Sequence, residues 1–218
     1  HFGFTEDLLL SANEGFKALW LARIGNGETV GSAWSEGGKE SIDQFSTRLS
    51  RQSDGAAVLN GQKYYTTGSL YAEWIDVGIT DLEGNSASII IPRNAAGVEI
   101  IDDWNGFGQR LTASGTCIFD NVRVNDEPRA TDQRFAYGQS FFQIYHLSTL
   151  AGIARRAALS GADELHSRSR TFSTGNADSA AQDVQLLQVI GEVASQAYAA
   201  QAIARYAAQR LESTDRKS

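Results

Sequence analysis

The order of hydrophobic and polar positions divides the chain into three zones. Residues 4–24 carry apolar side chains at helical spacing, and Gly25 and Gly27 end this pattern, which predicts a short helix. From about 28 to 125, short runs of β-branched and aromatic residues alternate with turn residues, as in strands. Helical spacing then returns and predicts two helices, over 139–167 and about 182–212. The chain is therefore expected to form a helix, a β domain and a pair of long helices.

The β zone predicts strands without helices between them. Asn60-Gly61 lies between AAVL and QKYYTT and predicts a two-residue hairpin turn, because both central positions of that turn need positive φ. Such a series favours an antiparallel sandwich or barrel over a doubly wound sheet, and no GxGxxG segment occurs. The other expected strands are ETVGSAWS, TRLSRQ, EWIDVGIT, SASIII, GVEII and GTCIFDNVRV, with turns at Asp54-Gly55, Glu83-Gly84-Asn85 and Asn94 to Gly97.

The last predicted helix carries a heptad seam rich in alanine. Small side chains would let a neighbouring helix approach closely, and helices of this length need bundle partners. A bundle within the chain and an interface between subunits fit this pattern equally well. Asp178 or Ser179 in the preceding loop offers an N-cap. The seam positions are Leu186, Ile190, Val193, Ala197, Ala200, Ala204, Ala207 and Leu211.

Composition excludes several classes of function. With 26 acidic and 19 basic residues in 218, the net charge is -7, and no basic cluster stands out before the last few residues, which disfavours nucleic acid as a partner. No apolar run is long enough for a membrane span. The single cysteine, Cys117, lies in an apolar run typical of a buried, inert thiol, so we expect a reducing cytoplasm. The chain starts at His1 without Met, which we interpret as a piece of a longer protein with no visible signal peptide.

Two segments concentrate the candidate chemistry. Residues 63–75, KYYTTGSLYAEWI, and residues 102–116, DDWNGFGQRLTASGT, place hydroxyls, glycines and aromatic rings at the ends of strand-like runs. Such groups can hold a flat polar ligand, and neither segment contains a metal cluster or a nucleophile triad. The chemistry is therefore expected to belong to a bound cofactor, with no metal site.

These motifs resemble the acyl-CoA dehydrogenase superfamily. SAWSEGGKES at 32–41 and NGQKYYTTG at 60–68 match its paired motifs in order and spacing. Tyr65 and Gly68 stand where dehydrogenases usually have Trp and Asn. The sequences of residues 63–75 and 102–116 are similar to those of the dibenzothiophene monooxygenase and dimethylsulfone-utilisation branch. The resemblance implies an α+β fold with an antiparallel β-barrel or sandwich middle domain followed by a long-helix bundle. The implied domains are 1–27, the end of an N-terminal helical domain, 28–130, a flavin-binding β domain, and 131–218, the first part of a C-terminal bundle.

The resemblance also implies a function. The expected protein is a two-component monooxygenase that uses O2 and reduced flavin, supplied by a separate flavin reductase, on a sulfur-containing or aromatic small molecule. The cofactor would be reduced FMN or FAD, and the protein a cytoplasmic homotetramer. One alternative is an FAD-dependent acyl-CoA dehydrogenase that desaturates an acyl-CoA thioester. Another is a non-catalytic oligomerisation module built on the alanine seam.

Site residues follow from the same resemblance. The Thr67 hydroxyl would bond the central ring nitrogen of the flavin, with Tyr65 near the ring edge and Ser41 at the phosphate region. The implied cofactor residues are Ala33, Trp34, Ser35, Ser41, Tyr65, Thr66, Thr67, Arg168, Arg170 and Phe172. The implied substrate pocket contains Trp34, Arg110, Thr112, Ser114, Phe142 and Tyr145, and the catalytic candidates are His1, Phe2, Tyr65 and His146.

Several of these residues have simpler alternative roles. Thr67 and Ser35 could be turn hydroxyls bonded to their own backbone. Arg168 and Arg170 near a helix C-terminus could interact only with the helix dipole and water, although a planar guanidinium suits a phosphate. His146 could be a core residue satisfied by its neighbours.

Overall fold

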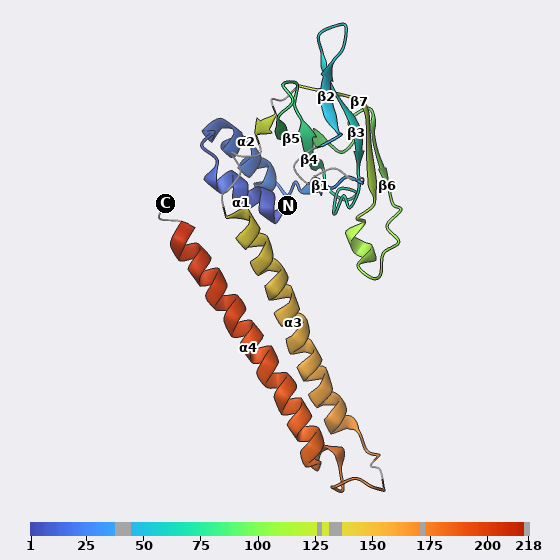
Figure 1. Cartoon of the computed structure of the whole chain (residues 1–218), viewed down its shortest axis with the longest axis vertical. Helices are drawn as coiled ribbons and strands as arrows, with labels where there is room; N and C mark the ends of the chain where they lie inside the picture. The colour runs from blue at the N-terminus through green and yellow to red at the C-terminus, as the bar shows by residue number, and fades with distance from the viewer. Residues whose placement is uncertain (38–44, 126–127, 131–136, 171–172, 216–218) are drawn as a thin grey trace. The chain divides into compact units, whose positions relative to one another are not determined.

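The computed structural model describes residues 1–37, 45–125, 128–130, 137–170 and 173–215. The chain divides into two compact units, His1–Phe135 and Ala136–Ser218. The first unit contains two short helices and an 8-stranded sheet, and the second contains two long helices (Figure 1). The α+β organisation expected from the sequence is observed.

The predicted N-terminal helix is two helices. Helix α1 spans Phe2–Leu10 and α2 spans Glu14–Gly25. The break arises because the Asn13 side chain caps α2, its Oδ1 accepting from the backbone N of Phe16 at 2.9 Å. Both helices pack on the sheet: Phe4, Leu8 and Trp20 form a buried cluster with strand residues.

The strands agree with most of the pattern. Their order in the sheet is β6-β7-β3-β2-β4-β5-β8, with β1 also paired to β4. Most neighbours are antiparallel, as predicted, but β1 and β2 both run parallel to β4 and follow one another along the same edge of it. The chain therefore leaves β1 after Ala33, within the motif SAWSEGGKES at 32–41, before it returns to the same edge as β2. The strands are β1 Val30–Ala33, β2 Arg48–Arg51, β3 Ala57–Lys63, β4 Trp74–Thr80, β5 Ser86–Pro92, β6 Val98–Ile101, β7 Thr116–Val124 and β8 Arg129–Ala130.

The predicted hairpin at Asn60-Gly61 is wrong. Both residues lie inside β3, and the chain turns between β2 and β3 at Asp54-Gly55, where Gly55 has φ 83°. Gly61 marks a register shift against β7, and a Cβ there would lie 2.5 Å from the Cα of Thr47. The glycine permits an irregular, closely packed strand rather than a turn.

The sheet encloses the main core of the first unit. Its fully buried residues include Ile75, Val77 and Ile79 of β4, and Cys117 of β7. Cys117 is a free thiol, and burial raises its pKa to about 12, so it stays protonated.

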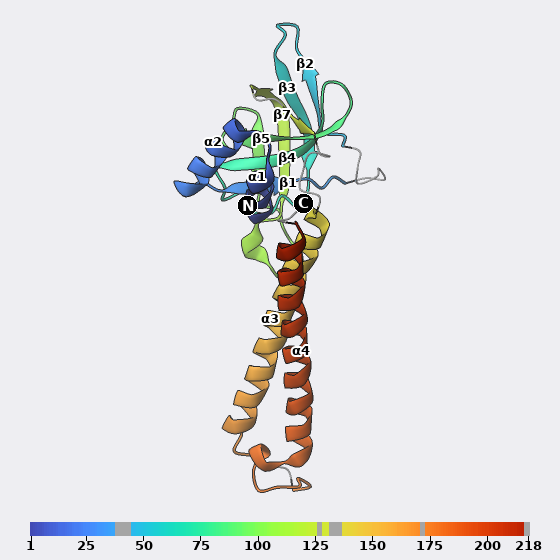
Figure 2. The ribbon, with the colours of Figure 1, turned by 90° about the vertical axis from the view of Figure 1, so that its left-hand side faces the viewer.

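The second unit is a helical hairpin. Helix α3 spans Gly138–Ser167 and α4 spans Val184–Asp215, and both views show them running side by side (Figures 1 and 2). Ala197 and Ala204 of the predicted seam are buried, and a Cβ on Gly161 would lie 2.9 Å from Ile190, so the seam packs within the hairpin at these positions.

The N-cap prediction for the last helix is wrong. Asp183 caps α4, with Oδ1 accepting from the backbone N of Gln185 at 2.9 Å, because the short 3-10 helix Ala180–Gln182 separates Ser179 from α4. Across the described residues, no helix combines the length and apolar character that a bilayer span requires.

Candidate functional site

The two segments singled out in the sequence meet beside β1. The backbone N and Oγ1 of Thr66 donate to the carbonyl of Gly115 at 3.1 and 2.9 Å, and the N of Gly68 donates to the carbonyl of Thr112 at 3.0 Å. On the other side, the backbone N of Ser32 in β1 donates to the carbonyl of Thr67 at 3.2 Å. The residues after β3 are thus held between β1 and the loop that joins β6 to β7.

Both segments contain unusual backbone conformations. Tyr65, Gln109 and Ala113 have φ of 54°, 51° and 42°, in the left-handed region that non-glycine residues seldom occupy, and Gly68 has φ 78°. Each such residue costs about 1–3 kcal/mol, and such strain concentrates at functional surfaces. Gly115 is required by space, because a Cβ there would lie 2.2 Å from the carbonyl oxygen of Ile101.

A row of hydroxyl groups links the two segments. Thr67 Oγ1 lies 2.8 Å from Ser114 Oγ, which lies 2.8 Å from Thr112 Oγ1. Thr112 Oγ1 in turn donates to the carbonyl of Gln109 at 2.7 Å. Thr67 is exposed, whereas Ser114 is 9% exposed, so the row begins at the surface and passes through a buried serine. Neither Thr67 nor Ser114 is merely a hydroxyl bonded to its own turn.

Exposed rings and apolar side chains occur on the same two segments as this row. Tyr65 is 61% exposed, and its ring packs edge-on against Trp104 with centroids 5.9 Å apart. Trp104 is fixed by Nε1 donation to the carbonyl of Gly108 at 3.2 Å. Phe107 and Leu111 on the same loop are also exposed. A surface that combines rings with hydroxyl and backbone polar groups fits a planar, polar-edged ring such as a flavin.

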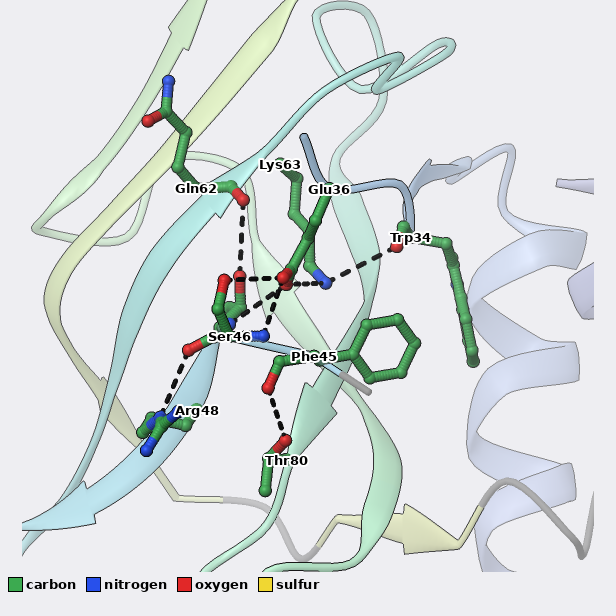
Figure 3. A network of polar contacts seen from close by, with 9 residues as sticks. Trp34, Glu36, Phe45, Ser46, Arg48, Gln62, Lys63 and Thr80 are labelled. Carbon is green, nitrogen blue, oxygen red and sulfur yellow. Dashed lines mark hydrogen bonds and ion pairs between the residues drawn. The ribbon is translucent and has the colours of Figure 1, made fainter. Parts of the chain in front are cut away.

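A buried ion pair that the sequence analysis missed supports this surface (Figure 3). The Nζ of Lys63, at the end of β3, is fully buried and lies 2.6 Å from Oε1 of Glu36 and 4.0 Å from the ring centroid of Phe45. The other contacts of the Glu36 carboxylate are the backbone N and Oγ of Ser46, at 2.7 and 2.6 Å, and the backbone N of Thr47, at 3.0 Å. The pair joins the segment after β1 to β3.

Charge and burial compete in this pair. Burial by itself would raise the pKa of Glu36, but hydrogen bonds from Lys63, Ser46 and Thr47 outweigh it and bring the pKa to about 2. Burial also lowers the pKa of Lys63, and the Glu36 carboxylate opposes that shift. The sequence held a signal for the pair, because alternation along the strand puts Lys63 on the same face as the buried Leu59. A buried ammonium group needs a carboxylate nearby.

The segment 33–36 lies beside this pair. Ala33 is buried, and the carbonyl of Ser35 accepts from the backbone N of Tyr64 at 2.8 Å. Trp34 donates from Nε1 to Asp76 Oδ2 at 3.1 Å, and its ring meets Phe45 at 5.8 Å. Ser35 pairs with Tyr64 in an isolated antiparallel bridge, and Tyr65 is the next residue after this pairing.

The N-terminal candidates have defined contacts. The Nδ1 of His1 accepts from the backbone N of Val30 at 3.3 Å, and the Phe2 ring is exposed. Arg110, in the 3-10 helix Arg110–Thr112, is exposed. Ser41 and Phe172 lie outside the described residues.

The remaining candidates belong to the second unit. Phe142, Tyr145 and His146 lie exposed on α3, so His146 is not a core residue of the hairpin. Arg168 and Arg170 line a hollow of about 240 Å³ together with residues of the α3–α4 loop, among them Asn176 and Asp183. Within the described ranges, no group of side chains is arranged to hold a metal ion.

Curated relatives of this chain include dibenzothiophene monooxygenases and a probable FMNH2-dependent monooxygenase. The dibenzothiophene monooxygenase of Mycolicibacterium goodii is 30% identical over 199 residues, covering 84% of this chain and 48% of that protein. The one from Rhodococcus erythropolis is 28% identical over 220 residues, covering 94% of this chain and 52% of that protein. "Probable FMNH2-dependent monooxygenase SfnC" of Pseudomonas putida is 27% identical over 174 residues, covering 76% of this chain and 44% of that protein. The chain thus spans about half the length of the curated relatives it matches, and no protein-family model matches it.

Solved structures share the fold. The complex of TdsC from a Paenibacillus species with FMN and indole has a TM-score of 0.82 at 27% identity, covering 94% of this chain and 55% of that chain. An acyl-CoA dehydrogenase complexed with FAD from Bacillus anthracis has a TM-score of 0.76 at 22% identity, covering 92% of this chain and 35% of that chain. The predicted acyl-CoA-dehydrogenase-like fold is confirmed, as is the similarity to the dibenzothiophene monooxygenase branch.

Proposed function

We propose that this chain, with its acyl-CoA-dehydrogenase-like fold, is the flavin-binding part of a two-component monooxygenase acting on a sulfur-containing or aromatic small molecule. The observation that carries this proposal is the joined pair of loops, where exposed Tyr65 and the hydroxyl of Thr67 share one surface. The names of the relatives in sequence, dibenzothiophene monooxygenases, support the reaction class.

The cofactor that we propose is reduced FMN. TdsC was solved with FMN, and the Pseudomonas relative is named as FMNH2-dependent. When bound, reduced flavin supplies the activation of O2 and the transfer of one oxygen atom to the substrate. FAD is the second candidate, because a dehydrogenase of the same fold was solved with it.

The residues of the chain then bind, orient and exclude water. We propose that Thr67 meets the central ring nitrogen, that Tyr65 and Trp104 wall the ring edge, and that the segment 33–35 meets the pyrimidine end. The buried Lys63–Glu36 pair supports this assignment, because it anchors the segment after β1 to the end of β3. Exposed rings around the site suit the exclusion of water, which an oxygen-transferring flavin requires.

The other candidate residues are assigned to the phosphate, to proton transfer and to the substrate. Arg168 and Arg170 are the proposed phosphate ligands for the flavin of a neighbouring subunit, because both line one hollow and a planar guanidinium suits a phosphate. The accessible ring of His146 supports a role in proton transfer, whereas Nδ1 of His1 already accepts from Val30. Phe2, Arg110, Phe142 and Tyr145 are exposed, which suits contact with a substrate.

We propose two protein partners. A separate flavin reductase would supply the reduced cofactor, and a homotetramer in the cytoplasm is the proposed assembly. Exposed apolar side chains on α4, among them Tyr198, Ile203 and Tyr206, support burial of that helix against further protein.

The second candidate function is an FAD-dependent acyl-CoA dehydrogenase, which the shared fold favours. An experiment on the purified protein distinguishes the two functions. The bound flavin is identified, and acyl-CoA is then added in the absence of oxygen. We expect no bleaching of the oxidised spectrum, and oxygen-dependent product formation from a sulfide or aromatic substrate when a flavin reductase is present. Bleaching by acyl-CoA would reject the monooxygenase.

A further inference from the structure

Four polar contacts run in a row from Tyr65 to Gln109 through three hydroxyl groups. The carbonyl of Tyr65 lies 3.3 Å from Thr67 Oγ1, and contacts of 2.8, 2.8 and 2.7 Å then lead through Ser114 and Thr112 to the carbonyl of Gln109. Carbonyl oxygens can only accept, so the row has three protons for four contacts. One contact must therefore lack a proton.

The distances identify that contact. Hydrogen bonds between oxygen atoms are usually about 2.5–3.0 Å long, so the 3.3 Å contact at Tyr65 is the weak one. With the three short contacts filled, Thr112 donates to Gln109, Ser114 donates to Thr112, and Thr67 donates to Ser114. The Thr67 hydroxyl thus points its proton inward and its lone pairs outward, on an exposed residue.

We infer that Ser114 and Thr112 are positioning residues that hold the Thr67 hydroxyl as a hydrogen-bond acceptor, so that this surface prefers reduced flavin to oxidised flavin. The inference rests on the proposed function, with Thr67 at the central ring nitrogen. In reduced flavin that nitrogen carries a hydrogen and is a donor, which matches an acceptor. In oxidised flavin it carries only a lone pair, so two acceptors would face each other.

Reversing the donor direction of the three hydroxyl groups costs a hydrogen bond. To donate outward, Thr67 must give up its bond to Ser114, and the row can be refilled only by turning Ser114 and Thr112 as well, which empties the 2.7 Å contact to Gln109. If Thr67 turned alone, the bond lost would be the one to Ser114, which is buried, so water would not readily replace it. The row would therefore favour retention of the reduced cofactor and release of the oxidised one.

The test compares the binding of FMN in its two redox states. Flavin-free protein is titrated anaerobically with oxidised FMN and with chemically reduced FMN, and the midpoint potential of bound FMN is measured against a redox dye. In the wild type we expect reduced FMN to bind more tightly. Ser114→Ala and Thr112→Val each release the proton of Thr67, so the ratio of the oxidised to the reduced dissociation constant should fall about tenfold. For this two-electron couple, a tenfold change lowers the potential by about 30 mV.

Two control variants separate the direction of the hydroxyls from general damage to the loop. Thr112→Ser keeps the hydroxyl and should keep the wild-type ratio. Thr116→Val, at the first residue of β7, removes a hydroxyl that donates to Asp103 of the loop, outside the row, and should also keep the ratio. If all four variants change the ratio alike, loop damage explains the result and the inference is overturned.

Other outcomes have distinct meanings. An unchanged ratio in both Ser114→Ala and Thr112→Val, with normal thermal unfolding, would overturn the positioning role while leaving the flavin site in place. Failure of the wild type to bind FMN in either redox state would overturn the proposed function, and the inference with it.

Discussion

The ammonium group of Lys63 contacts the Glu36 carboxylate, the ring of Phe45 and the carbonyl of Trp34. A buried ion pair adds little net stability compared with a well-packed apolar pair, but the loss of one partner leaves a buried charge without compensation. The polar contacts of Ser46 and Thr47 to Glu36 make this carboxylate the centre of the network in Figure 3.

We therefore expect Glu36→Gln to lower the free energy of unfolding by about 3 kcal/mol, because the amide leaves the Lys63 charge buried. Urea unfolding followed by circular dichroism measures this change. The double variant Glu36→Gln with Lys63→Met removes the charge and should recover part of the loss. Arg123→Gln, in the exposed Arg123–Asp54 pair, is the control and should have little effect. Equal losses in Glu36→Gln and Arg123→Gln would contradict the role of burial.

Acid should weaken the same pair. The pKa of Glu36 is about 2 in the folded protein and 4.5 ordinarily, so folding favours the ionised form. Its contribution to stability is complete above pH 4.5 and is lost as the pH falls toward 2. The difference in unfolding free energy between wild type and Glu36→Gln should shrink over this window, as measured by urea unfolding at several pH values. A difference that stays constant down to pH 2 would show that the carboxylate charge does not stabilise the fold.

The Thr67 hydroxyl gives a direct prediction for the cofactor. Thr67→Val keeps the shape of the side chain and removes the proposed hydrogen bond, so reduced FMN should bind about five- to tenfold more weakly. Anaerobic fluorescence titration measures the affinity, and Thr116→Val, which removes a hydroxyl at the start of β7 outside the row, is the control. Unchanged affinity in Thr67→Val would remove Thr67 from the site.

Among the elements, β3 departs most from its sequence pattern. It contains the Asn-Gly pair expected in a turn, and Gly61 instead sits at the register shift against β7, beside Thr47. The local sequence identified residues that permit an unusual backbone conformation. Whether such residues form a turn or an irregular strand depends on the strands that pack against them, which come from elsewhere in the chain.

This placement predicts a strong response to a single methyl group. Gly61→Ala would bring Cβ within 2.5 Å of the Thr47 Cα, so we expect a loss of about 2 kcal/mol or more in unfolding free energy. Gly84→Ala is the matched control: Gly84 also has positive φ, but nothing lies within 4 Å of the added Cβ. Both variants are measured by urea unfolding, and equal losses would show that backbone conformation alone, without the close contact, sets the cost.

Periodicity predicted the existence of most elements because it depends on neighbours a few residues apart. It predicted α3 and α4 and most strands, and it located the two loops that meet at the candidate site. It did not predict that β1 runs parallel to β4, that Lys63 pairs with Glu36, or that Thr67, Ser114 and Thr112 share one row of hydroxyls. These contacts join segments far apart in the sequence, where no local pattern constrains them.

The molecule as a whole contains two units with unequal interiors. The sheet unit has a core of buried aliphatic and aromatic residues, whereas Ala151, Leu165, Ala197 and Ala204 are the buried apolar residues of α3 and α4 among those described. A two-helix hairpin with so few buried side chains depends on packing against further protein for its stability.

We therefore expect the 218-residue chain, produced alone, to lose helical signal at a lower urea concentration than the sheet unit loses structure. Cys117 is the single cysteine and is buried in the sheet, so its reaction with a thiol reagent reports opening of that unit. Far-ultraviolet circular dichroism follows the long helices in the same samples. Coincident transitions would show that the two units unfold together.

The open space beside Gly68 bears on which residues can occupy this position. Gly68 has φ 78°, and nothing lies within 4 Å of the place where its side chain would begin. Asparagine, which dehydrogenases usually carry here, is among the side chains that most readily adopt this backbone conformation. Asparagine could therefore replace Gly68 without rebuilding the loop, so this position can differ between related proteins while the backbone around it stays as it is.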